Sequence, residues 1–269
     1  MDEIIRIFTH SPTAEIAWSV AFVALGAGAI SPLVVMHKMA FFSDSVSHSV
    51  LLGVPIAIFA GMMEETWAML AVGISVGLIV NLLRWRTTLS VDSILGVMMA
   101  GTLALAVVMY QEIATSKHLD SYLLGDIAFL PKAWFLPLMF TSLGVLAFSL
   151  FAFNRLALLA IARELVQARG LRSRIYDIAM VMVLAIVVTL GVRIMGVLMI
   201  TALMVIPAAS ARNICRRLST YFWTSVSISV LASLIGFVLC YHKDYAPGAS
   251  IVVVLMGFFL LSLLGAKRA

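Results

Sequence analysis

Residues 41–53, which read FFSDSVSHSVLLG, contain the side chains with the greatest capacity for chemistry. Asp44 and His48 are four positions apart, so on a helix they share one face, about one turn from each other. A carboxylate and an imidazole placed in this way can both face one divalent cation, a pair of ligands that suits zinc, manganese or iron. The alternative is a structural Asp–His hydrogen bond that holds helices together or lies at the membrane interface. Spacing alone leaves both interpretations open, and two ligands do not complete a metal site.

Two polar segments between apolar runs contain further candidate ligands. Their imidazoles and carboxylates are Glu112, His118, Asp120 and Asp126 in one segment, and His242 and Asp244 in the other. Such groups near an entrance raise the local concentration of cations, although loop residues of this kind are usually only solvated. Glu112, His242 and Asp244 are therefore secondary metal candidates.

Other chemistries lack the residue patterns that they need. The sequence contains neither an HExxH metalloprotease motif nor a GxxxxGK(S/T) phosphate-binding loop. Its two cysteines, Cys215 and Cys240, are far apart and form no CxxC pair, so neither a disulfide framework nor a thiolate metal site is indicated. We expect no catalytic residues in this chain, and a transport protein is favoured over an enzyme.

The composition is that of a membrane protein. Of the 269 residues, 63% are hydrophobic and 12% are charged, and the mean hydropathy is +1.11. Soluble domains contain about 25% charged residues, so a soluble fold is excluded. The net charge of +5 reflects the distribution of basic residues about a membrane rather than binding to nucleic acid.

Nine apolar runs are long enough, at about 1.5 Å per helical residue, to cross about 30 Å of hydrocarbon. They comprise residues 13–36, 47–62, 66–83, 93–112, 132–153, 175–192, 195–211, 221–241 and 249–264. The second and seventh runs are short and contain helix breakers, Gly53 with Pro55 in one and Pro207 in the other. Either could be a broken or re-entrant element, so we expect eight or nine spans. The predicted fold is an all-α, polytopic transmembrane helix bundle that forms a single domain over residues 1–269.

Basic residues predict the orientation of this bundle, because cytoplasmic loops are enriched in Lys and Arg. If residues 154–174 are cytoplasmic, alternating spans place 13 of the 18 basic residues on the cytoplasmic side. This asymmetry predicts a cytoplasmic C-terminus and, with nine spans, an external N-terminus.

The segment 154–174 is the second region of interest. Residues 160–168 are compatible with a short amphipathic helix, and Gly170 is a plausible stop. One interpretation is a solvated basic loop that fixes topology. The other is a cytoplasmic coupling helix for a partner protein, with Arg163, Glu164, Ala168, Arg169 and Gly170 as its contact residues.

In chain order, several motifs resemble those of the permease subunits of bacterial zinc, manganese and iron ABC importers, and most closely the zinc-uptake permease. The matching motifs are FFSDSVSHSVLLG, SVDSILGVMMA, DSYLLGDI, RELVQARGL, GVLMITALMVIPAASAR and DYAPGASIVVV, which together cover nearly the whole chain. The resemblance implies that Asp44 and His48 are the principal metal contacts and that the RELVQARGL loop docks on an ATPase. The chain departs from the family pattern at Ser43, Ser45 and Ser49. The hydroxyl groups added at these positions could alter the preference for a metal or form hydrogen bonds to the backbone.

The resemblance also implies an assembly. Its members would be a second permease copy, a cytoplasmic ATP-binding subunit and an extracytoplasmic metal-binding protein, in a bacterial inner membrane. No permanently bound cofactor is expected, and the transported ion would be zinc, with manganese or iron as alternatives. Two rival functions are a secondary carrier that uses Asp44, His48 and Glu112 as a proton relay, and an intramembrane metalloenzyme.

Overall fold

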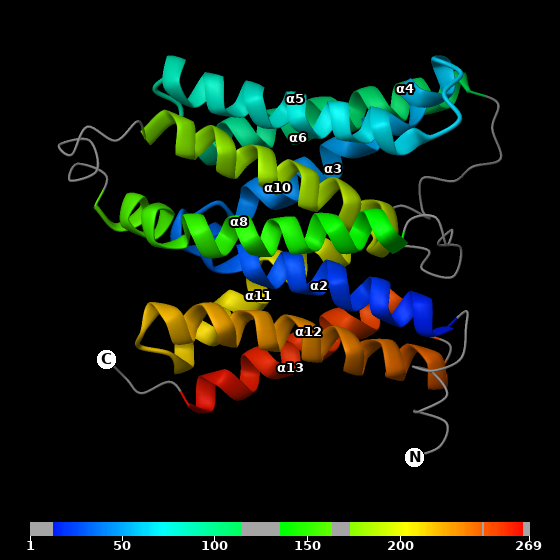
Figure 1. Cartoon of the computed structure of the whole chain (residues 1–269). Helices are drawn as coiled ribbons and strands as arrows, with labels where there is room; N and C mark the ends of the chain where they lie inside the picture. Colours follow the sequence, from blue (N-terminus) through cyan, green and yellow to red (C-terminus); the bar gives the residue numbers. More distant parts are fainter. Residues whose placement is uncertain (1–12, 114–134, 163–172, 244, 266–269) are drawn as a thin grey trace.

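The computed structural model describes residues 13–113, 135–162, 173–243 and 245–265, and every regular element within them is a helix (Figure 1). The helices are α2 (Thr13–Met36), α3 (Ala40–Ser49), the 3-10 turn η1 (Val50–Leu52), α4 (Gly53–Phe59), α5 (Glu65–Arg86), α6 (Val91–Glu112), α8 (Phe135–Ile161), α10 (Ser173–Met195), α11 (Val197–Ile214), α12 (Leu218–Lys243) and α13 (Pro247–Leu264). In the described part of the chain, nine helical segments are long and apolar enough to cross a membrane. The predicted all-α bundle is confirmed, with nine spans rather than eight.

The second span begins earlier than the sequence analysis predicted. We expected a run over residues 47–62, whereas the helix starts at Ala40 and passes through α3, η1 and α4 to Phe59. Four serines lowered the apparent hydropathy of its first turns, but each of these serines is buried against other helices. The start at Ala40 was missed for that reason, and it places Asp44 and His48 inside the span.

The seventh span, for which the sequence left open a broken or re-entrant element at Pro207, is continuous. Helix α11 continues through Pro207 to Ile214. Proline removes one backbone donor and disturbs the hydrogen bonds around it, and here a neighbouring helix supplies compensation. The amide of Ala208 donates to the hydroxyl of Ser31 on α2 at 3.3 Å.

The fifth span is longer than predicted. Residues 154–161 were assigned to a cytoplasmic loop, yet α8 continues through them to Ile161. This stretch, NRLALLAI, consists mostly of strong helix formers, and Arg155 anchors it to α10 by donating to the Tyr176 hydroxyl at 2.8 Å. The predicted coupling residues, 163–170, lie outside the described residues.

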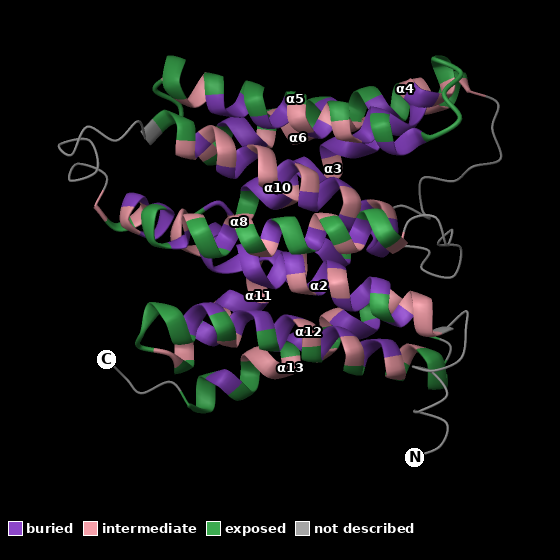
Figure 2. Ribbon diagram, viewed as in Figure 1, coloured by how far each residue is buried: buried purple, intermediate pink, exposed green. Residues whose placement is uncertain are grey.

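The core lies along α2. This helix contacts α8, α11 and α12, while α10 packs on α5, and α3 lies between α6, α10 and α11. Buried residues follow α2, the second span and α10, whereas α6, α8 and α13 have far fewer buried residues (Figure 2). The second span is therefore an interior element, in contact with α5, α6, α10 and α11.

Close helix approach depends on two glycines. A Cβ on Gly53 would lie 2.5 Å from the backbone of Met69, so α4 can approach α5 only because this side chain is absent. Gly196 has a φ of 81° and is the single residue between α10 and α11. Such a left-handed conformation favours glycine, and it allows the chain to reverse sharply between these two spans.

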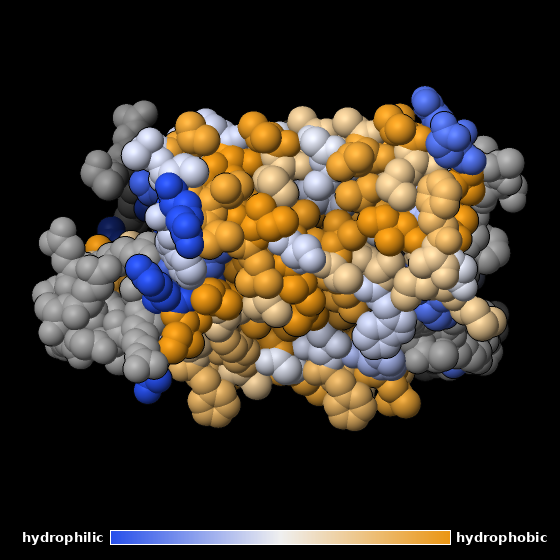
Figure 3. Space-filling view, turned by 90° about the horizontal axis from the view of Figure 1, so that it is seen from above, coloured by the Kyte–Doolittle hydropathy of each residue, from blue (hydrophilic) through white to orange (hydrophobic). Residues whose placement is uncertain are grey.

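The outer surface is apolar across the middle of the bundle. On the face seen in Figure 3, hydrophobic side chains fill the centre and hydrophilic ones lie toward the two ends. Exposed apolar residues occur on α5, α6, α8, α12 and α13. This pattern matches a hydrocarbon belt between two polar boundaries.

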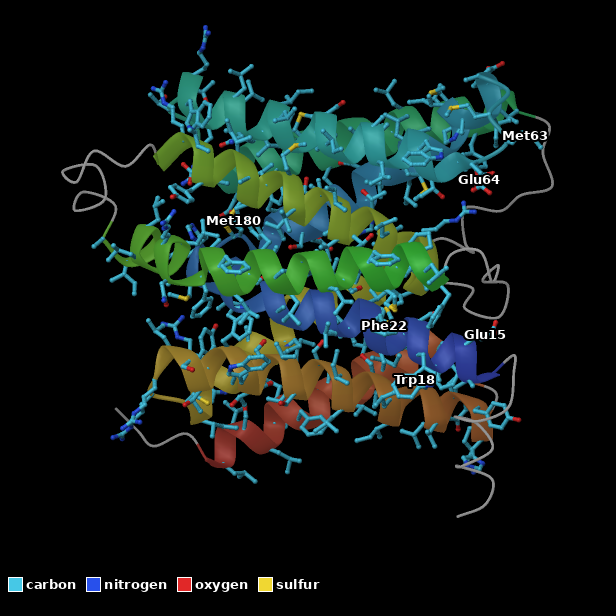
Figure 4. All side chains as sticks on the ribbon, viewed as in Figure 1. Glu15, Trp18, Phe22, Met63, Glu64 and Met180 are labelled. Atoms are coloured by element: carbon cyan, nitrogen blue, oxygen red, sulfur yellow. The ribbon has the colours of Figure 1, made fainter. Side chains whose placement is uncertain are left out.

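The two ends of the bundle differ in charge. The end where α2, α5, α8, α11 and α13 finish and α12 begins (the left in Figure 1) carries most basic residues of the described chain. These residues are Lys38, Arg84, Arg86, Arg155, Arg174, Arg212, Arg216 and Arg217. The opposite end carries acidic residues, including Glu15 and Glu64 (Figure 4). We call these the basic end and the acidic end.

At the acidic end, Arg193 joins the end of α10 to the start of α5. Its guanidinium donates to Glu65 Oε2 at 3.3 Å and lies 3.8 Å from Glu64 Oε2. The Glu65 side chain is 7% exposed, whereas that of Glu64 is 50% exposed. The sequence analysis missed this ion pair, because its partners are 128 positions apart.

Candidate metal-binding site

Asp44 and His48 lie on one face of α3, as predicted from their spacing. The Nε2 atom of His48 is 3.8 Å from Oδ1 of Asp44, which is longer than a hydrogen bond. Since both residues belong to the same helix, their interaction cannot tie two helices together. The structural alternative, an Asp–His hydrogen bond that locks helices, therefore has no support in this geometry.

The pair is partly open, whereas the four serines of α3 beside it are enclosed. The His48 side chain is 26% exposed and the Asp44 side chain 39% exposed, whereas the serines at positions 43, 45, 47 and 49 are fully buried. A half-exposed carboxylate is costly against lipid and in membrane proteins faces a bundle interior or a water-filled cavity. A polar space, the membrane interface or another protein surface would each suit this face of α3.

His48 is not committed to a structural role. Its Nδ1 atom is buried and has no hydrogen-bond partner in the described part of the chain. Nε2 faces the Asp44 carboxylate at a distance that leaves room for an ion to draw the two groups together. The imidazole is therefore available as a ligand through Nε2.

Helix α6 fixes the orientation of α3. The Ser45 hydroxyl donates to the carbonyl oxygen of Leu95 at 3.0 Å, and the Thr102 hydroxyl donates to Ser49 Oγ at 2.7 Å. These buried bonds hold one face of α3 on α6 and leave the Asp44–His48 face free. Two of the three unusual serines thus anchor the helix. The third, Ser43, has a buried hydroxyl with no partner among the described residues.

The secondary candidates do not join the pair. Ser45 lies level with Leu95, and Glu112 is 17 residues farther along α6, roughly 25 Å toward the acidic end at 1.5 Å per residue. His242 is exposed in the last turn of α12, also at the acidic end. Asp244 lies outside the described residues, as do His118, Asp120 and Asp126.

The described residues provide no complete set of ligands. Nowhere in them do three or more His, Cys, Asp or Glu side chains gather around one position. Asp44 and His48 thus offer two ligands, and the remaining positions around an ion would have to be filled by water or by groups from another chain.

Nine apolar helices in the described residues, each long enough to cross a membrane, define a multi-pass membrane protein. The model of the ABC 3 transport family matches residues 11–266, and the chain belongs to this family. A relative from Haemophilus influenzae with the name "Probable iron transport system membrane protein" is 26% identical over 240 residues, which are 88% of each chain. The zinc uptake membrane protein ZnuB of the same organism is 29% identical over 239 residues, 87% of this chain and 90% of the relative.

The fold is shared with a solved structure. The structure described as PsaBC from Streptococcus pneumoniae in complex with Fab superposes with a TM-score of 0.86. Its sequence is 22% identical, and the match covers 97% of this chain and 94% of that chain. The chain is accordingly a membrane-spanning permease of the ABC type, and these findings give no support to the secondary carrier.

Proposed function

We propose that this chain forms the membrane pathway of an ATP-driven importer for a divalent transition-metal ion, zinc first of all, and that Asp44 and His48 contact the ion. The single observation that carries the assignment of the site is the partly open Asp44–His48 face of α3, which is flanked by four fully buried serines. The family and the names of its zinc and iron relatives support the cargo class.

The depth of the pair suits a transported ion. His48 is eight residues beyond the first residue of α3, roughly 12 Å into the bundle from the basic end. At that depth an ion needs ligands that replace its hydration, and a carboxylate also offsets its charge.

Zinc accepts imidazole nitrogen and carboxylate oxygen as ligands, and the same pair serves manganese or iron. Cys215 follows α11 at the basic end, Cys240 lies in the last turn of α12 at the acidic end, and in the described residues neither joins Asp44 and His48 in a group of three or more candidate ligands. We propose zinc as the cargo, with manganese or iron as the ions to compare with it.

The assembly follows from what the chain lacks. Its sequence has no phosphate-binding loop, so a separate ATP-binding subunit would supply energy by docking on residues 163–170 at the cytoplasmic side. A second permease copy would cover the open face of α3, and an extracytoplasmic protein would deliver the ion. The basic end would face the cytoplasm of a bacterial inner membrane, with the C-terminus inside.

The test is uptake of radioactive zinc by vesicles that contain the permease with its ATP-binding subunit. Asp44→Asn and His48→Gln keep the approximate size of each side chain, and we expect each to lower the rate of uptake at least about 10–100-fold, because losing even a partner that only supports a metal ligand has an effect of this size. Glu112→Gln is the matched control, because this carboxylate lies at the acidic end and is exposed. It should transport at the normal rate.

Three results would contradict the proposal. Normal uptake in both variants would make the pair structural. A loss in the Glu112 control equal to that at Asp44 would show a general effect of charge. Uptake that continues without any ATP-binding subunit would indicate a gradient-driven carrier instead.

A further inference from the structure

A pocket opens at the basic end of the bundle, away from the Asp44–His48 pair. It has a volume of about 320 Å³ and lies where the ends of α2, α8 and α11 meet the start of α12. Four of its lining residues are basic, namely Lys38, Arg212, Arg216 and Arg217, and none is acidic. All four are exposed and none makes an ion pair within the described residues. The pocket is thus a concentrated positive site with no acidic side chain among the described residues that line it.

Lys38 occupies a position that normally belongs to glycine. The amide of Lys38 donates to the Val35 carbonyl at 3.2 Å and that of Met39 to the Val34 carbonyl at 2.9 Å, the pattern of a Schellman helix end. Lys38 sits at the left-handed residue of this motif with a φ of 55°, where a side chain is unfavourable. Unfavourable backbone of this kind concentrates at functional positions, and here it brings a lysine to the wall of the pocket.

Tyr221 provides a second, independent observation. It lines the pocket from the first turns of α12 and is 6% exposed, and its hydroxyl is buried with no hydrogen-bond partner in the described part of the chain. A buried hydroxyl without a partner is unfavourable unless a ligand satisfies it. The first amides of α12, a helix of 26 residues, add positive partial charge at the same place.

We propose that this pocket binds the phosphate headgroup of an anionic phospholipid such as phosphatidylglycerol. The four cations would hold the phosphate, and a shift of the Tyr221 side chain on binding would bring its buried hydroxyl within reach of it. Beside them, Ile161 is 70% exposed and Leu218 is 44% exposed, and these apolar side chains would contact the first part of the acyl chains. A soluble phosphate would need only the charges, whereas a lipid explains why charged and exposed apolar side chains line one pocket at the end of membrane spans.

The proposal adds a lipid requirement to the permease and does not depend on the identity of the transported metal. Basic pockets between spanning helices are suited to anionic headgroups, and each Lys or Arg near a charged lipid surface strengthens binding about fivefold. Four such groups around one phosphate would therefore retain a lipid during purification.

The experiment is a titration of the purified full-length chain, with any subunits that co-purify, in a neutral detergent. Phosphatidylglycerol is added and bound lipid is counted by native mass spectrometry. Phosphatidylcholine tests the need for net negative charge, and glycerol 3-phosphate tests the phosphate without acyl chains. We expect phosphatidylglycerol to bind at least about tenfold more tightly than either, since they lack the net charge or the apolar part.

The variants separate lost binding from lost folding. Lys38→Gly removes the charge and places the residue that the turn prefers, so it should weaken lipid binding about fivefold while thermal stability stays equal or rises. Tyr221→Phe removes only the hydroxyl and should weaken binding about tenfold, as for a lost hydrogen bond to a charged group. Arg86→Gln is the control, because Arg86 is an exposed arginine at the same end that does not line the pocket.

Several outcomes would overturn the proposal. Equal binding of glycerol 3-phosphate and phosphatidylglycerol would show a site for soluble phosphate. Equal binding of phosphatidylcholine, or an equal loss in Arg86→Gln, would show nonspecific lipid adsorption. If Arg216→Gln with Arg217→Gln releases a co-purifying subunit and leaves lipid binding unchanged, the pocket is a protein interface.

Discussion

Replacing Glu65 by Gln removes the buried carboxylate that pairs with Arg193 at the acidic end. The two residues join α5 to α10, and Glu65 accepts a hydrogen bond at 3.3 Å from a guanidinium that is 23% exposed. Glu64, the preceding residue, faces the same guanidinium at 3.8 Å but is half exposed. The adjacent positions allow a buried and an exposed partner of one arginine to be compared.

The structure gives unequal magnitudes for the two substitutions. Breaking a buried ion pair by removing one partner costs about 3–5 kcal/mol. Partial exposure of Arg193 and the remaining Glu64 reduce this to about 2–3 kcal/mol for Glu65→Gln. Glu64→Gln should cost about 0–1 kcal/mol, as for a surface pair. At about 2–4 °C per kcal/mol for chains of roughly this size, Tm should fall by about 4–12 °C and by less than about 4 °C, respectively.

The assay is thermal unfolding of the purified variants in one detergent, followed by intrinsic tryptophan fluorescence. Combining Glu65→Gln with Arg193→Gln should restore part of the lost stability, because no unpaired buried charge then remains. Equal falls in Tm for the Glu64 and Glu65 variants would refute the reasoning from burial. The reasoning would also be refuted if the double variant lost more stability than the sum of the losses in the two single variants.

Two further predictions concern packing and topology. Gly53→Ala should destabilise the chain by about 1–3 kcal/mol through overpacking, because the new Cβ would lie 2.5 Å from the Met69 backbone. Gly101→Ala is the control, because the space around its Cβ is open. It should leave Tm unchanged or raise it slightly. In a background without native cysteines, Arg86→Cys should react with an impermeant thiol reagent only from the cytoplasm and Lys243→Cys only from outside. Labelling of both from the same side would contradict the proposed orientation, and an unchanged Tm for Gly53→Ala would contradict the close approach of α4 and α5.

The spans were predictable because the bilayer sets their length. The first predicted run, residues 13–36, coincides with α2, and the other runs overlap the observed helices. Errors occurred where tertiary contacts override local hydropathy. The buried serines of α3 made a spanning helix look polar, and the Ser31 hydroxyl compensates the break at Pro207. Neither contact is visible in a local window of sequence.

The candidate site was half predictable. The i, i+4 spacing correctly placed Asp44 and His48 on one helical face, but only the packing of Ser45 and Ser49 on α6 shows that this face stays open. The Arg193–Glu65 pair and the basic pocket combine residues far apart in sequence. In the sequence, the ion pair shows only as an arginine next to an apolar run, and the pocket only as a lysine at a helix end. The fold is needed to interpret either feature.

X-ray absorption spectroscopy at the zinc edge can show directly whether a transported ion contacts Asp44 and His48. The full chain with its co-purifying subunits is loaded with zinc and compared with His48→Gln and Asp44→Asn. In the unmodified protein we expect imidazole nitrogen and carboxylate oxygen ligands at about 2.0–2.2 Å from the zinc ion. His48→Gln should lose the imidazole signal, and Asp44→Asn should bind zinc more weakly. An unchanged imidazole signal in His48→Gln would show that the ion is held elsewhere and would contradict the account.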